Sequence, residues 1–141
     1  MPFAVWMDKY NQTIVDIFGN NMNINSQNAF EYFNNKQDPE WSALIYIQEN
    51  ITAFSFDEWT TYIDYVTKLI IGKNSSEIED LPYYELWHGL ANPLLVALYA
   101  IFQSSETLAD TCLPKDAYEI WNNSNYNNEI KNKIDYIMQH Y

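Results

Sequence analysis

The segment from Asn92 to Gln103 constrains the fold more than any other part of the chain. After Asn92 and Pro93 it reads Leu-Leu-Val-Ala-Leu-Tyr-Ala-Ile-Phe-Gln. Proline is favoured at the start of a helix, and a helix that is apolar on every side belongs in a protein interior. The apolar run is about half as long as a membrane span. We therefore expect a fully buried helix at the centre of the fold.

A second helix, from about Phe56 to Ile71, carries start and stop signals at both ends. Ser55 and Glu58 have the spacing of a capping box, and Gly72 follows where a helix commonly ends in a left-handed residue. Between these signals, apolar side chains recur at helical spacing: Trp59, Tyr62, Ile63, Val66 and Ile70. This pattern predicts an amphipathic helix with one buried face.

Further helices are expected in the rest of the chain. Asp38 and Pro39 resemble a capped helix start before Trp41–Glu49, although the β-branched residues within 43–47 also fit a buried strand. Amphipathic helices are predicted at 3–18 and 126–141, and shorter ones at 28–34, 81–90 and 115–121.

These elements predict an all-α fold. We expect an irregular bundle of about six or seven helices around the buried central helix, with α+β as the alternative. The three glycines and five prolines are few for a protein with many tight hairpins. A chain of 141 residues also has the length of a single globular domain, covering 1–141.

The sequence lacks the patterns that mark enzymes and metal proteins. Cys112 is the only cysteine, and three isolated glycines cannot form a phosphate-binding loop. His88 and His140 fit structural roles better than catalysis or metal binding, and no nucleophile motif is present. No pair of carboxylates stands out for acid–base chemistry. We therefore expect no catalytic residues, no metal and no cofactor, and a protein that is not an enzyme.

The N-terminal sequence has no basic region before its short apolar run, which Asp8 interrupts. This is unlike a secretory signal, and no segment is long enough to span a membrane. A cytoplasmic location is expected.

The charge balance indicates the chemistry of a partner. The chain carries a formal net charge of -12, from 19 carboxylates against 7 basic residues, and all of the basic residues are lysines. Binding to DNA, RNA or an anionic membrane requires cationic side chains near phosphate groups. The composition therefore argues against direct nucleic-acid or membrane binding and favours a basic protein partner.

Acidic and aromatic residues concentrate between positions 76 and 85. Tyrosine is favoured at interfaces because it buries a large area at low entropic cost. The candidate partner-binding residues in this stretch are Glu77, Glu79, Asp80, Tyr83, Tyr84 and Glu85. A second set borders the helix predicted at 56–71 and contains Asp57, Glu58 and Asp64. Helix capping also accounts for acids at these places, including a capping box that would start at Ser76.

In size, charge and lack of catalytic motifs, the chain is similar to the small acidic immunity proteins of bacteriocin and contact-dependent inhibition systems. The resemblance implies an antitoxin that binds and inhibits a basic cognate toxin, with a nuclease favoured because nucleases hold phosphate in a cationic cleft. Two alternatives fit the same sequence. One is a phage-encoded DNA mimic of the anti-CRISPR type, and the other is a helical scaffold or regulatory subunit.

Overall fold

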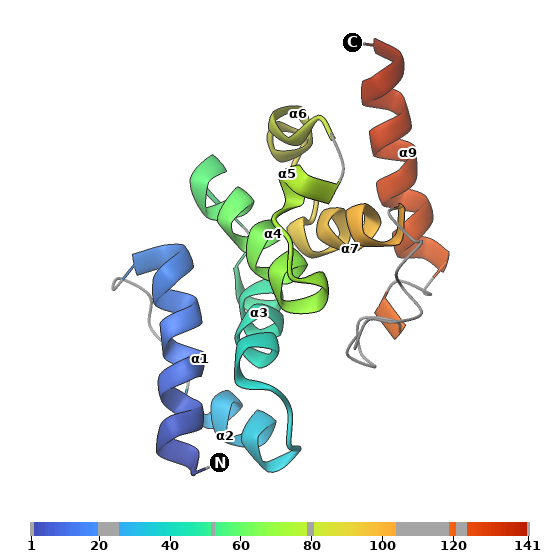
Figure 1. The fold of residues 1–141 in the computed structure, drawn as a ribbon. Helices are drawn as coiled ribbons and strands as arrows, with labels where there is room; N and C mark the ends of the chain where they lie inside the picture. The colour runs from blue at the N-terminus through green and yellow to red at the C-terminus, as the bar shows by residue number, and fades with distance from the viewer. Residues whose placement is uncertain are drawn as a thin grey trace. The chain divides into compact units, whose positions relative to one another are not determined.

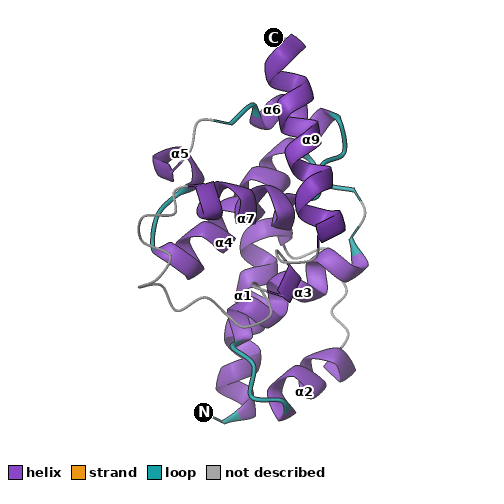
Figure 2. Ribbon diagram, turned by 90° about the vertical axis from the view of Figure 1, so that its right-hand side faces the viewer, coloured by secondary structure: helices purple, strands orange, loops and turns teal. Residues whose placement is uncertain are grey.

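The structure is a computed structural model that describes residues 2–19, 26–51, 53–78, 81–103, 119–120 and 124–140. The chain forms two compact units, Met1–Glu58 and Trp59–Tyr141. All regular secondary structure in the described residues is helical, which confirms the all-α prediction (Figure 2). A single domain over 1–141 stays a prediction.

The first unit contains three helices that contact one another: α1 (Phe3–Phe18), α2 (Ser26–Asn34) and α3 (Pro39–Asn50) (Figure 1). Apolar residues recur at helical spacing along α1, as an amphipathic helix requires: Trp6, Tyr10, Ile14 and Ile17 are buried, and Phe18 is half-buried. The rings of Trp6 and Tyr10 stack with their centroids 5.3 Å apart. The Trp6 Nε1 donates a hydrogen bond to the Gln37 carbonyl oxygen at 2.9 Å, which ties α1 to the segment before α3.

Helix α3 begins as its sequence predicts. The Asp38 carboxylate accepts a hydrogen bond from the Trp41 amide at 3.1 Å, and Pro39 occupies the first helical turn. Residues 43–47 are helical, so the alternative of a strand here is wrong. The side chains of Ala43, Leu44 and Ile47 are fully buried. The stabilisation from this packing outweighs the low helix propensity of the β-branched residues in the segment.

Helix α4 (Phe56–Ile71) has the predicted boundaries and both predicted end signals. The Glu58 amide donates to Ser55 Oγ at 3.1 Å, and the Ser55 amide donates to Glu58 Oε1 at 2.7 Å, which completes the capping box. At the other end Gly72 has a φ of 73°, a left-handed conformation that glycine adopts without steric cost.

In the second unit, α7 (Pro93–Gln103) is the buried helix that the sequence predicts. Asn92 Oδ1 accepts hydrogen bonds from the Leu94 and Leu95 amides at 2.9 and 3.3 Å, which caps the helix start. All described side chains from Pro93 to Ile101 are buried except the half-buried Tyr99. Helix α7 contacts α5 (Ser75–Ile78) and α9 (Ser124–His140), so it lies at the centre of this unit's packing.

The remaining predicted helices shift by a few residues or lie partly outside the described residues. The segment 81–90 is helical only over α6 (Tyr83–His88), and α9 begins two residues before the predicted 126. The apolar stripe expected in this helix comprises Ile130, Ile134, Ile137 and Tyr141. Ile130 and Ile134 are buried, Ile137 is half-buried, and Tyr141 lies outside the described residues. Of the helix predicted at 115–121, only 119 and 120 are described, and both are helical.

None of the helices in the described ranges combines the length and apolar character needed to cross a membrane.

Candidate functional site

The two predicted binding acids at the start of α4 differ in their surroundings. The Glu58 carboxylate accepts the Ser55 amide, so this side chain stabilises the helix start. Asp57 is exposed in the first turn, where a negative charge complements the helix dipole. Both acids therefore have structural roles in α4.

Asp64 joins two helices of the second unit. Its Oδ1 accepts hydrogen bonds from the Ser75 amide at 3.0 Å and from Ser75 Oγ at 2.7 Å. Asp64 is half-buried and Ser75 is buried. Since one oxygen of the carboxylate receives two donors from the start of α5, Asp64 connects α4 to α5 in addition to any role in binding.

Glu77 caps α5, and the cap starts at Asn74 instead of Ser76. The helix begins at Ser75, and the Asn74 amide donates to Glu77 Oε2 at 3.3 Å. The capping box predicted from Ser76 is therefore wrong by two residues, because Ser75 is already helical and Asn74 is the residue whose amide pairs with Glu77. Glu79 and Asp80 lie outside the described residues.

The two predicted binding tyrosines differ in exposure. Tyr83 is half-buried, its hydroxyl donates to the Ser75 carbonyl oxygen at 3.4 Å, and its ring meets that of Trp59 edge-on at 6.4 Å. Tyr84 is 56% exposed, and its ring lies 5.6 Å from that of Trp87 and 6.3 Å from that of His88. Tyr84 thus presents an aromatic side chain to solvent within a small aromatic group on α6.

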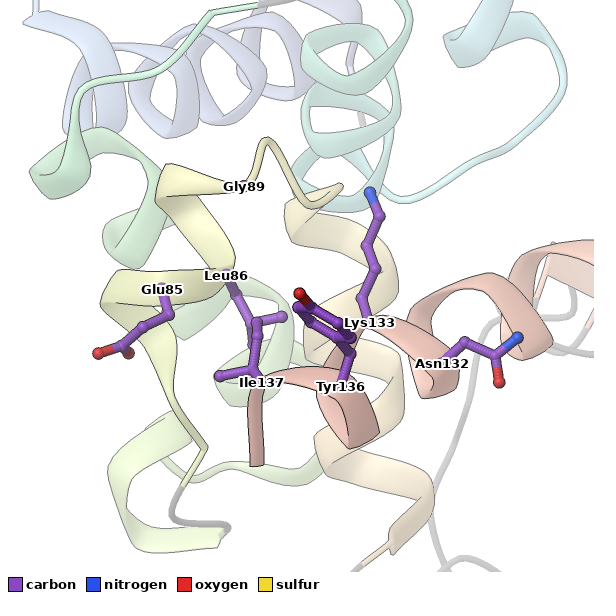
Figure 3. A pocket seen from close by; sticks show the side chains of 7 residues that line it. All are labelled: Glu85, Leu86, Gly89, Asn132, Lys133, Tyr136 and Ile137. Atoms are coloured by element: carbon purple, nitrogen blue, oxygen red, sulfur yellow. The ribbon is translucent and has the colours of Figure 1, made fainter. Parts of the chain in front are cut away.

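Glu85 lines a cavity of about 380 Å³ formed where α6 contacts α9. We call it the α6–α9 cavity, and its lining residues are Glu85, Leu86, Gly89, Asn132, Lys133, Tyr136 and Ile137. Figure 3 shows the Leu86 and Ile137 side chains facing each other, with the Tyr136 ring beside them. The Glu85 carboxylate and the Lys133 ammonium point away from this apolar group in different directions.

The Glu85 carboxylate differs from those of Glu58, Asp64 and Glu77. Within the part of the chain that the structure describes, its side chain makes no hydrogen bond or ion pair. It is half-buried at the cavity, so it is partly shielded from water. Of the predicted binding acids that the structure describes, Glu85 is the one that lines a cavity and whose carboxylate has no hydrogen bond or ion pair with another described residue.

Two exposed side chains on α9 are not among the binding residues that the sequence predicts. Tyr136 is 63% exposed and Met138 is 62% exposed. Both lie off the apolar stripe of Ile130, Ile134 and Ile137, so a search for buried periodicity passes over them. An aromatic residue on the polar face of an amphipathic helix is the signal that points to Tyr136.

The end of α6 adds a further exposed apolar residue. The Leu90 amide donates to the Trp87 carbonyl oxygen at 3.0 Å, and the Ala91 amide donates to the Leu86 carbonyl oxygen at 2.9 Å. This is the hydrogen-bond pattern of a Schellman motif, with Leu90 in the left-handed position at a φ of 62°. Leu90 is 85% exposed.

Among the described side chains, no group of three or more His, Cys, Asp and Glu residues is placed to hold a metal ion. The α6–α9 cavity offers a ligand an apolar wall, a carboxylate and an ammonium group. Comparison with protein-family models, with curated proteins and with solved structures finds no match to this chain.

Proposed function

We propose that this protein is an immunity protein, an antitoxin that binds and inhibits a basic cognate toxin, with a nuclease as the favoured class. The observation that carries the proposal is the α6–α9 cavity of a chain with net charge -12, where apolar side chains line the wall and Glu85 contributes a carboxylate without a hydrogen bond or ion pair among the described residues. Interfaces gain most of their affinity from a few side chains seated in such pockets, while surrounding charge increases the association rate.

The charge of the chain supports long-range attraction of a basic partner. The first unit holds eight carboxylates and two lysines, and the second holds eleven carboxylates and five lysines. Each unit therefore has the same surplus of negative charge. A field distributed in this way attracts a cationic protein from many directions and does not depend on a single acidic cluster.

The alternative of a DNA mimic has less support from the site. A mimic needs carboxylates that are available to stand in for phosphates, yet Glu58, Asp64 and Glu77 accept hydrogen bonds from their own chain.

The alternative of a scaffold subunit differs from the inhibitor in how its association with a partner responds to salt. Association through an apolar surface depends little on ionic strength.

The test is co-purification with the product of the adjacent gene, followed by a nuclease assay of that product with and without this protein. We expect a stoichiometric complex and loss of nuclease activity. We also expect the association rate constant to fall about tenfold or more between low and high salt, because screening removes electrostatic steering.

An unrelated acidic protein of similar net charge serves as the control and should leave the nuclease active. A complex whose association rate ignores salt would support the scaffold instead. If the adjacent product neither binds nor is inhibited, the immunity proposal is wrong.

A further inference from the structure

The chemistry of the α6–α9 cavity matches one kind of side chain. We propose that the cavity receives an arginine side chain of the basic partner, an inference that rests on the proposed function. The aliphatic stem of the arginine lies against Leu86 and Ile137, and its guanidinium group pairs with the Glu85 carboxylate. The following observations support this assignment.

The size of the cavity suits one long side chain. Its volume of about 380 Å³ lies at the lower end of the range, about 300–1,000 Å³, that small-ligand pockets occupy. The cavity is lined by one short helix and the C-terminal half of α9, so it offers a site for a single side chain rather than a groove for a whole helix.

The walls of the cavity match an arginine stem. Leu86 is buried and Ile137 is half-buried, and the two side chains point toward one another and both line the cavity (Figure 3). The ring of Tyr136, 63% exposed, forms the outer wall. Arginine buries its methylene groups along apolar surfaces while its charged end stays near water, and guanidinium also stacks on aromatic rings.

The two charged residues that line the cavity determine the orientation of a bound arginine side chain. The Glu85 carboxylate attracts a cation, and the Lys133 ammonium repels one, so the guanidinium belongs at the Glu85 end. Glu85 has no competing hydrogen bond or ion pair in the described part of the chain. A guanidinium pairs with both oxygens of a carboxylate and is more weakly hydrated than an ammonium, which favours arginine over lysine.

The test uses n-butylguanidinium, which carries the arginine stem and head group, and n-butylurea, a neutral molecule of the same shape. Each is titrated into the full chain, and amide shifts are followed in two-dimensional nitrogen–proton spectra. We expect saturable shifts at Leu86, Gly89 and Tyr136 with n-butylguanidinium, with a dissociation constant on the order of 10 mM for so small a ligand. n-Butylurea should bind at least about threefold more weakly.

Two pairs of variants assign the contacts. Glu85→Gln should weaken n-butylguanidinium binding about threefold, the effect of losing one partly exposed ion pair, whereas Glu129→Gln on α9 should not. Tyr136→Ala should weaken binding by a similar factor, whereas Met138→Ala should not, since Met138 is 62% exposed and does not line the cavity. All four side chains are exposed or half-buried, so the fold is expected to persist in each variant.

Equal binding of the urea and the guanidinium, or shifts unaffected by Glu85→Gln, would overturn the arginine assignment. The nuclease assay is independent of this titration. If the titration fails and the adjacent gene product is still inhibited, the arginine inference is wrong and the proposed function stands. If n-butylguanidinium binds as expected but the adjacent product is not inhibited, the proposed function fails and the cavity chemistry stands.

Discussion

Among the residues that the structure describes, two other than glycine adopt left-handed backbone conformations at helix ends. Lys36 has a φ of 59° after α2, and Leu90 has a φ of 62° after α6. Both helix ends have the hydrogen bonds of a Schellman motif. After α2, the Lys36 amide donates to the Phe33 carbonyl oxygen and the Gln37 amide donates to the Tyr32 carbonyl oxygen, in the same pattern as after α6. Side chains with a Cβ atom are strained in this conformation. Both positions therefore carry a local cost that glycine would avoid.

We expect Leu90→Gly and Lys36→Gly each to raise the free energy of unfolding by about 0.5–1 kcal/mol, because the relief of strain exceeds the entropy that glycine adds to the unfolded chain. Both side chains are exposed, so neither change removes buried contacts. Urea denaturation measures the effect.

Alanine at the same two positions is the control, since it keeps the Cβ and should give little gain. A loss of stability in both glycine variants would show that the left-handed residues are not strained.

Between neighbouring helices, the Asp64–Ser75 contact is the clearest polar connection. Because Asp64 Oδ1 receives both the amide and the hydroxyl of Ser75, Asp64→Ala should leave two donors without their acceptor at a buried residue. We expect a loss of about 1–3 kcal/mol for Asp64→Ala and about 1 kcal/mol for Ser75→Ala in urea denaturation.

The double variant should be little worse than Asp64→Ala alone, because the hydroxyl bond is lost only once. Glu129→Ala, at an exposed position of α9, is the control and should change stability by less than about 0.5 kcal/mol. Fully additive single effects would contradict a direct bond between the two side chains.

Local sequence signals account for much of the helical structure. The cap of α3 at Asp38, the capping box of α4 and the apolar run of α7 involve residues within a few positions of one another, so the sequence alone predicts them. The connection between α4 and α5 is different, because Ser75 donates to Asp64, eleven positions earlier. No local pattern reports such a contact.

The candidate site was only partly predictable for the same reason. The sequence identified Tyr84 and Glu85 from their composition, but the cavity exists because α6 meets α9, almost fifty positions along the chain. Lys133 and Tyr136 become relevant only through that contact. The left-handed residue after α6 is also unexpected, since Gly89 precedes it and would be the usual choice for that conformation.

Across the full chain, buried tyrosines make stability depend on alkaline pH. Burial raises the pKa of Tyr10 and Tyr62 well above the ordinary value near 10. Burial, with the nearby Glu49 carboxylate as the next cause, raises the pKa of Tyr32 to about 12. The folded chain thus keeps these phenols protonated at a pH where the unfolded chain ionises them.

It follows that the stabilisation from Tyr32 is fully present below pH 10 and is lost as the pH rises through 12, while that from Tyr10 and Tyr62 also declines above pH 10 and is lost at still higher pH. We expect the free energy of unfolding to fall over this interval, and phenolate absorbance to show tyrosines that ionise only after the exposed ones. Tyr32→Phe should make the decline shallower. A single phenolate transition near pH 10 for all 12 tyrosines would contradict this expectation.

The central position of α7 has a consequence for synthesis on the ribosome. Its apolar residues emerge before α9, whose contacts cover part of them in the folded unit. At translation rates of about 5–20 residues per second, the nascent chain waits roughly 2–7 s between the end of α7 and the end of α9. During that delay the α7 surface that α9 later covers has no such cover, and the acidic residues already made oppose aggregation of the growing chain.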